Sequence, residues 1–214
     1  MSARKPAVVL PPFDCRDLPE LADPSALVAG VDEVGRGALF GPVVAAAVVV
    51  PVAELDALTE LGEKDSKQLS APRRVELAAQ IKEVVLDWQV GAAEAAEIDR
   101  INILQASLQA MRRSVLGLDV YPTVCLVDGK FPIPELSLSQ VNLIKGDARS
   151  PLIAAASIIA KVWRDEQIVQ LAECYPEYAL ASNKGYGTGA HREALQRYGP
   201  TPQHRQSFRP CRVE

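Results

Sequence analysis

The sequence has no long hydrophobic run. No apolar stretch among its 214 residues approaches the roughly 18 uncharged residues of a membrane-spanning helix. The first residues also lack the basic region and following apolar segment that mark a secretory signal peptide. We therefore expect neither a membrane span nor a signal peptide.

Cysteine is scarce, and its spacing suits neither metal binding nor cross-linking. The chain has four cysteines, widely separated and without a C-x-x-C pair: Cys15, Cys125, Cys174 and Cys211. This distribution argues against a zinc site and against a disulfide framework, so we expect a reducing, cytoplasmic setting. Internal repeats and low-complexity segments are also absent. A content of 48% hydrophobic residues is sufficient for one well-packed domain.

The chain also lacks the overall positive charge that usually accompanies nucleic-acid binding, because its net charge is −4. The charges are unevenly distributed, however. Residues 184–214 hold six Lys and Arg against two Glu, a charge of +4, so residues 1–183 carry −8. An acidic body with a basic end suits a protein that gathers divalent cations in one place and binds an anionic polymer in another. A solvated basic end without a partner is the alternative.

The most informative stretch is residues 29–50, which read AGVDEVGRGALFGPVVAAAVVV. Two adjacent carboxylates, Asp32 and Glu33, end a short apolar run, and a Gly-Arg-Gly loop follows at 35–37. A valine-rich run bounded by prolines then predicts a second strand at 43–50. Because a charged acid beside a buried strand is costly without a cation, we expect a metal or a strong salt bridge there. A solvated turn is the alternative.

The remaining patterns predict an α/β fold with a mixed sheet flanked by helices. Ser70 and Ser150 are expected to cap the helices that follow them, each with a proline in the first turn. We expect an irregular leader over 1–24, a main domain over 25–178 and a small helical substrate-binding segment over 179–214. Strands are expected at about 27–33, 43–50, 87–93, 123–127 and 140–144. Helices are expected at about 70–86, 98–118, 151 onward and 190–198, with a short helix or turn at 54–62.

Two further acids stand at positions that favour a functional role. Asp128 ends the expected strand 123–127 and precedes a glycine, which repeats the arrangement at Asp32. Asp165 falls on a helical stripe with Ile158, Val162 and Val169, where an apolar residue is expected. A surface ion pair is the alternative for Asp165, but we favour a functional acid.

Acids at the ends of two strands and on one helix are expected to converge at one edge of the sheet. Four close carboxylates cannot all remain ionised unless cations neutralise them. Oxygen ligands select Mg²⁺ or Mn²⁺, and two such ions can assist in-line displacement at a phosphodiester. Strand alternation sends Asp32 and Glu33 to opposite faces, so both are expected to reach the metals only if the chain has already turned at Glu33.

Six motifs occur in order between about Leu27 and Phe208, and together they carry a resemblance to a known family. They are G-V-D-E-V-G-R-G, D-S-K-Q-L-S, L-V-D-G, K-G-D, A-A-A-S-I-I-A-K-V-x-R-D and K-G-Y-G-T. In this combination the chain resembles ribonuclease HII, the type 2 ribonuclease H. The resemblance implies an RNase H-like fold and a Mg²⁺- or Mn²⁺-dependent endonuclease.

The implied activity is cleavage of the RNA strand of RNA–DNA hybrids and incision 5′ of a single ribonucleotide embedded in duplex DNA. Two-metal hydrolysis of this kind leaves a 3′-hydroxyl and a 5′-phosphate, and a monomer is expected. The alternatives are a ribonuclease HIII-like nuclease and a non-catalytic hybrid-binding protein.

The resemblance also implies roles for particular residues. Backbone groups of a glycine loop can approach the 2′-hydroxyl that distinguishes RNA from DNA, and a tyrosine ring can pack on the neighbouring deoxyribose. Lys67 and Lys184 are candidates for phosphate contacts. The implied metal-binding and catalytic acids are Asp32, Glu33, Asp128 and Asp165, and the implied substrate-sensing residues are Gly35, Arg36, Gly37 and Tyr186.

Overall fold

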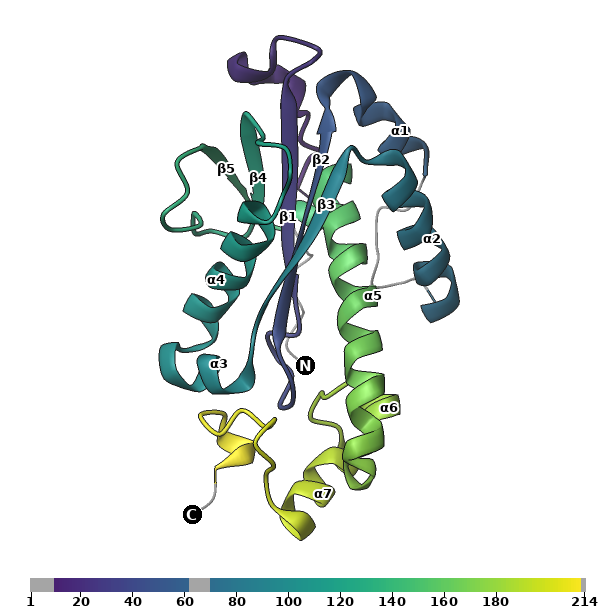
Figure 1. Cartoon of the computed structure of the whole chain (residues 1–214), viewed down its shortest axis with the longest axis vertical. Helices are drawn as coiled ribbons and strands as arrows, with labels where there is room; N and C mark the ends of the chain where they lie inside the picture. Colours follow the sequence, from purple (N-terminus) through teal and green to yellow (C-terminus); the bar gives the residue numbers. More distant parts are fainter. Residues whose placement is uncertain (1–9, 62–69, 213–214) are drawn as a thin grey trace, which may run out of the picture.

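The structure is a computed structural model that describes residues 10–61 and 70–212 (Figure 1). Its centre is a five-stranded sheet in the order β3-β2-β1-β4-β5. The first three strands pair antiparallel, whereas β4 and β5 run parallel to β1, so the predicted mixed sheet is confirmed. The strands are β1 (Leu27–Val34), β2 (Val43–Pro51), β3 (Asp87–Ala93), β4 (Val124–Asp128) and β5 (Ser139–Leu143).

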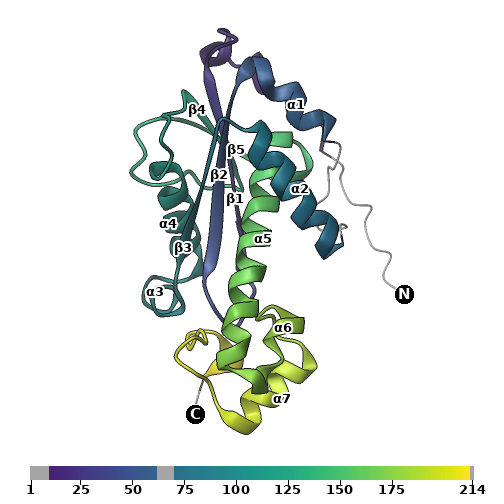
Figure 2. The ribbon, with the colours of Figure 1, turned by 45° about the vertical axis from the view of Figure 1, so that its right-hand side comes forward.

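Helices cover both faces of this sheet, as Figures 1 and 2 show. The longest helix, α5, lies along one face with α1 and α2 beside it, and α4 packs on the other face. The α-helices are α1 (Leu55–Glu60), α2 (Ala71–Val84), α3 (Ala95–Ile101), α4 (Ile103–Leu116), α5 (Pro151–Cys174), α6 (Leu180–Asn183) and α7 (Gly189–Tyr198).

The valine- and alanine-rich strand β2 is buried on both faces, which explains why its sequence does not alternate. Its even-numbered residues from 44 to 50 join the core formed with α5 and α2. Its odd-numbered residues from 43 to 49 join the core formed with α4. The continuous apolar run therefore places β2 inside the sheet between two helical layers.

Two details of the helices differ from the sequence predictions. The single helix expected over 98–118 is broken at Asn102, whose φ is +69°. The Asn102 side chain accepts hydrogen bonds from the amides of Leu104 and Gln105, so it ends one helix and caps the next. Ser70 caps α2 through its hydroxyl as predicted, whereas Ser150 precedes α5 without a capping hydrogen bond from its side chain.

The two ends of the described chain pack on different parts of the fold. Residues 10–24, expected to be irregular, include two short 3₁₀ helices that bury Cys15 and Leu21. Figure 2 shows α6 and α7 at the far end of α5. Residues of these helices form a third core cluster with Leu39 and Phe40 from the loop after β1. Within the described ranges, no helix is both long and apolar enough to span a membrane. The four cysteines are free thiols.

Candidate active site

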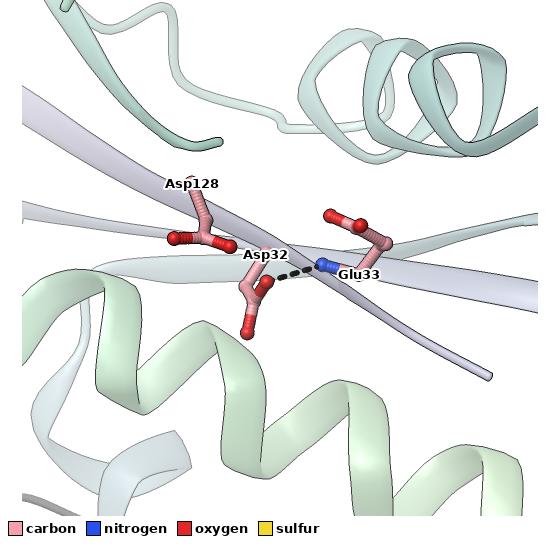
Figure 3. A group of neighbouring side chains, drawn as sticks. All are labelled: Asp32, Glu33 and Asp128. Carbon is pink, nitrogen blue, oxygen red and sulfur yellow. Dashed lines mark hydrogen bonds between the residues drawn. The ribbon is translucent and has the colours of Figure 1, made fainter. Parts of the chain in front are cut away.

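Three of the predicted acids meet where β1 and β4 lie side by side. These strands pair in parallel, with Val31 opposite Val127, so the residues that follow reach the same edge of the sheet. Asp32, Glu33 and Asp128 each offer one carboxylate oxygen, and the three oxygens lie within 4.8 Å of one another (Figure 3). The predicted convergence of strand-end acids is therefore present for these three residues.

Glu33 joins the group without the turn that strand alternation was expected to require. Strand β1 stays paired with β2 through Glu33 and Val34. Figure 3 shows the Asp32 carboxylate directed toward α5, while the Glu33 side chain leaves the other side of β1. Asp128 belongs to the neighbouring strand, and the chain turns away after it at Gly129, whose φ is +105°. The group thus combines side chains from both sides of β1 with Asp128 of the neighbouring strand. The prediction that the chain turns at Glu33 is wrong.

The surroundings of the acid group disfavour the ionised form of its carboxyl groups. Burial raises the pKa of Asp32 well above its usual value, and the neighbouring charges of Glu33 and Asp128 raise it further. A hydrogen bond from the Ser157 hydroxyl on α5 acts in the opposite direction. Burial also raises the pKa of Glu33, although its contact of 2.9 Å with the Arg36 guanidinium offsets part of that effect.

This arrangement fits a divalent cation. The donors are carboxylate oxygens only, which hard cations such as Mg²⁺ and Mn²⁺ prefer to the nitrogen and sulfur ligands of zinc. Arg36 supplies a single positive charge at the rim, against the carboxylates of Asp32, Glu33 and Asp128. A bound cation would therefore relieve the repulsion that raises the Asp32 pKa.

A fourth acid near the group is Asp147, to which the sequence analysis gave no role. The Gly146 amide donates a hydrogen bond of 2.6 Å to Asp128 Oδ1, in the 3₁₀ turn Gly146–Ala148 after β5. The charge of Asp147 contributes to the raised pKa of Asp32. The available signal was the K-G-D motif, in which a carboxylate follows a predicted strand end as Asp128 does.

Asp165 lies outside this group, so the predicted convergence of all four acids is not observed among the described residues. Its carboxylate contacts Lys161 Nζ at 2.7 Å and Arg74 Nη1 at 3.9 Å. Its helical stripe faces the core only in part, because Ile158 is buried and Val162 packs against the core, whereas Val169 is 41% exposed. The buried stripe of this part of α5 instead contains Arg164 and Ile168.

The two predicted substrate-sensing elements lie side by side, although about 150 residues separate them in the chain. Ala38, directly after the Gly35–Gly37 loop, forms an antiparallel β-bridge with Tyr186. The Leu39 amide also donates a hydrogen bond of 2.8 Å to the Gly185 carbonyl. Because Arg36 of the same loop binds Glu33, the loop connects the acid group to Tyr186.

Two fully buried arginines support this loop through hydrogen bonds to backbone carbonyls. Arg164 donates hydrogen bonds to the carbonyls of Pro42, Phe40 and Lys184. Arg205 donates to the carbonyls of Gly41 and Arg36. Arg164 also fills the space beside Gly35, where φ is +88° and a Cβ would lie 2.2 Å from Arg164 Nε. Arg205 is therefore part of the loop support, and its fully buried side chain is not available to contact a phosphate.

The predicted lysine contacts have different outcomes. Lys67 lies outside the described residues. Lys184 adopts a left-handed conformation at the end of α6, and its Nζ donates to the Ala181 carbonyl. The Tyr186 ring is partly buried, with Lys161 Nζ 5.6 Å and Arg164 Cζ 5.5 Å from its centre.

Comparison with known proteins identifies the family. Residues 29–211 match the family model described as Ribonuclease HII. The chain belongs to the ribonuclease HII family. It is 57% identical over 195 residues to the Ribonuclease HII of Trichormus variabilis, covering 91% of this chain and 87% of that protein. It is 58% identical over 191 residues to that of Acaryochloris marina, covering 89% and 96%.

Solved structures of ribonuclease HII relatives share the fold. The ribonuclease H2 of Pyrococcus horikoshii superposes with a TM-score of 0.74 at 29% identity, covering 87% of this chain and 95% of that one. The Archaeoglobus fulgidus RNase HII, solved as a complex with PCNA, gives 0.73 at 30% identity, covering 87% and 97%. A ribonuclease HIII in complex with Mn²⁺ is 22% identical with a TM-score of 0.72, which shows a common fold.

Ribonuclease HII membership gives the protein its activity. It is a type 2 ribonuclease H, a divalent-metal-dependent endonuclease that cleaves the RNA strand of RNA–DNA hybrids. The family match favours this assignment over the ribonuclease HIII-like alternative. The carboxylate group at the ends of β1 and β4 is compatible with the metal requirement of ribonuclease HII.

Proposed function

We propose that the protein also incises duplex DNA on the 5′ side of a single embedded ribonucleotide, leaving a 3′-hydroxyl and a 5′-phosphate. Such an incision begins the removal of ribonucleotides from DNA. One observation carries this proposal: the loop that bonds to Glu33 through Arg36 is bridged at Ala38 to Tyr186. Groups suited to sensing a ribose and its neighbouring sugar are thus connected to the acids that would hold the metal ions.

In this proposal, Asp32, Glu33 and Asp128 hold two divalent cations, Mg²⁺ or Mn²⁺, with Asp147 as the nearest additional acid. Such ions would promote deprotonation of the attacking water and stabilise the leaving oxygen during in-line displacement. The buried position of Asp32 keeps competing water away from its carboxylate. Ser157 and the Glu33 amide, each a hydrogen-bond donor to Asp32, fix the orientation of that carboxylate.

The same geometry supports recognition of one ribonucleotide. A Cβ at Gly37 would meet nothing within 4 Å, so the backbone at this position is open to a close approach. Only the 2′-hydroxyl distinguishes a ribose from a deoxyribose, and polar backbone groups can hydrogen-bond to it. The partly exposed Tyr186 ring beside this loop offers a flat apolar surface on which the next deoxyribose can pack.

The test uses three duplexes of one sequence: all DNA, DNA with one ribonucleotide, and a full RNA–DNA hybrid. Cleavage is measured with Mg²⁺, with Mn²⁺ and with excess chelator, and the product ends are mapped. We expect incision directly 5′ of the single ribonucleotide, none of the all-DNA duplex, and none with chelator. Cleavage confined to the full hybrid would refute incision at single ribonucleotides while leaving the family activity intact.

A further inference from the structure

The chain contains two histidines, His191 and His204, and the fold brings them together in the C-terminal segment. Both are fully buried, and their Nε2 atoms lie 3.0 Å apart. His191 is in the first turn of α7, and His204 lies in the turn that follows this helix. Neither belongs to the acid group, which is built on β1 and β4.

The partners of the two rings fix where each proton lies. His191 Nδ1 is 3.0 Å from the Tyr186 carbonyl oxygen, which can only accept, so His191 carries its proton on Nδ1. A neutral His191 then presents Nε2 as an acceptor to His204 Nε2, which must donate. His204 Nδ1 is consequently an acceptor, and the Thr201 amide donates to it at 2.9 Å. The chain of bonds is consistent only when both rings are neutral.

This pair joins the two substrate-sensing elements. His191 binds the backbone of Tyr186, and His204 forms an antiparallel β-bridge with Phe40, two residues beyond Ala38. The Phe40 and His204 rings also meet edge to face, with centres 4.9 Å apart. The imidazole pair therefore lies between the Tyr186 loop and the segment that continues from the glycine loop.

We propose that His191 and His204 are positioning residues. With one fixed pair of tautomers, they hold the Tyr186 backbone in the position from which its ring selects a single ribonucleotide. This inference rests on the proposed role of Tyr186. The pair lies outside the acid group, so it acts through the Tyr186 backbone. Desolvation by burial lowers the pKa of both imidazoles, that of His204 to about 4, which agrees with neutral rings at physiological pH.

Nitrogen NMR of the intact protein at neutral pH tests the tautomers directly. Long-range correlations between ring nitrogens and carbon-bound protons distinguish a protonated nitrogen from a bare one. We expect protonated Nδ1 with bare Nε2 for His191, and the reverse for His204. The opposite tautomers, or a doubly protonated ring in either residue, would overturn the proposal.

Matched variants test the consequence for selectivity. The amide of His191→Asn reaches the Nδ1 position and keeps a donor for the Tyr186 carbonyl, whereas that of His191→Gln reaches the Nε2 position and loses it. The readout is the ratio of kcat/KM on the single-ribonucleotide duplex to that on the full hybrid, measured beside melting temperature. We expect His191→Gln to lower this ratio by roughly fivefold, the effect of one hydrogen bond, and His191→Asn to retain most of it.

Tyr186→Ala separates failure of this inference from failure of the proposed function. If Tyr186→Ala leaves the ratio unchanged, the role of Tyr186 is refuted, and the positioning role falls with it. If Tyr186→Ala lowers the ratio but His191→Gln does not, the positioning role alone is refuted. Equal losses on both substrates in His191→Gln, together with a lowered melting temperature, would show that the histidines serve only stability.

Discussion

The Gly146 amide donates a hydrogen bond of 2.6 Å to Asp128 Oδ1, which ties the turn after β5 to the carboxylate that ends β4. Asp147 is the next residue, and its charge reaches Asp32 on β1. Strands β1 and β4 and the turn after β5 thus bring four acids to one edge of the sheet. Asp165 on α5 lies outside the group of Asp32, Glu33 and Asp128 and contacts Lys161 and Arg74 instead.

The first prediction compares Asp147 with Asp165. Asp147→Asn should lower kcat by at least about tenfold, because it removes a charge that acts on the metal-binding group. Asp165→Asn should stay within about threefold of the parent, since its partly exposed ion pairs contribute little. Steady-state cleavage of a hybrid at saturating substrate and Mn²⁺ measures kcat for both variants. A larger loss in Asp165→Asn than in Asp147→Asn would reverse the assignment.

The second prediction concerns Asp128. Asp128→Asn should lower cleavage by more than about a hundredfold, beyond the usual cost of disturbing a residue that only supports a metal ligand. Binding of the hybrid should remain close to that of the parent, because the substitution changes charge and little shape. Affinity measured without turnover, beside the cleavage rate, separates the two effects. Turnover within tenfold of the parent would remove Asp128 from the metal site.

The third prediction links the acid group to stability. The pKa of Asp32 and that of Glu33 are raised in the folded protein, so folding takes up protons and metal-free stability falls as pH rises above about 4. Asp32→Asn should therefore raise the metal-free melting temperature at neutral pH, by about 2 to 4 °C for each kcal/mol gained. Mg²⁺ or Mn²⁺ should stabilise the parent more than this variant. Equal stabilisation of both proteins would show that the cation binds elsewhere.

Much of the sheet and three of its acids could be predicted, because short local sequence patterns determine these features. The valine run of β2 and the short apolar runs that end at Asp32 and Asp128 specify buried strands with a carboxylate at the same edge. Asn102 shows the limit of the same approach. Its apolar neighbours continue the helical period, but its side chain satisfies the amides of a new helix start, so two helices form in place of one.

The partial exposure of the stripe that carries Asp165 has a longer-range cause. Helical spacing placed Asp165 on one stripe with Ile158, Val162 and Val169, and Arg164 about 100° away around the helix. Arg164 is nevertheless fully buried, because carbonyls of Pro42, Phe40 and Lys184 accept its hydrogen bonds. Those acceptors come from segments distant in the sequence, and helical periodicity alone does not reveal that they surround the same side chain.

The fourth prediction concerns phosphate contacts of the basic C-terminal segment. Arg192 is exposed and lies close to Gly187, the residue after Tyr186. A Cβ added at Gly187 would be 3.4 Å from Arg192 Nε. Arg192→Ala should reduce the slope of log affinity against log salt by about 0.9, the value for one phosphate contact on duplex DNA. Arg16→Ala is the matched control, because Arg16 is paired with Asp56 near the amino end. Equal slopes for both variants would mean that Arg192 contacts no phosphate.

The fifth prediction is that Tyr186 determines which substrate is cut. If its ring packs on the deoxyribose beyond the ribonucleotide, Tyr186→Ala should lose about 1 to 3 kcal/mol of stacking, roughly 5- to 150-fold in kcat/KM on the single-ribonucleotide duplex. Tyr186→Phe should retain most of that activity, because the ring remains. Cleavage of the full hybrid by Tyr186→Ala should change much less, since the acid group is intact.

The alternative for Tyr186 is a structural role, and the same variants distinguish it. The ring lies between Lys161 and Arg164, and its backbone pairs with Ala38, so its loss could loosen the loop itself. A loosened loop would disturb Arg36 and Glu33 and therefore lower the cleavage of every substrate together with the melting temperature. A selective loss at an unchanged melting temperature supports substrate sensing, because only a direct contact with the sugar beyond the ribonucleotide discriminates between the two duplexes.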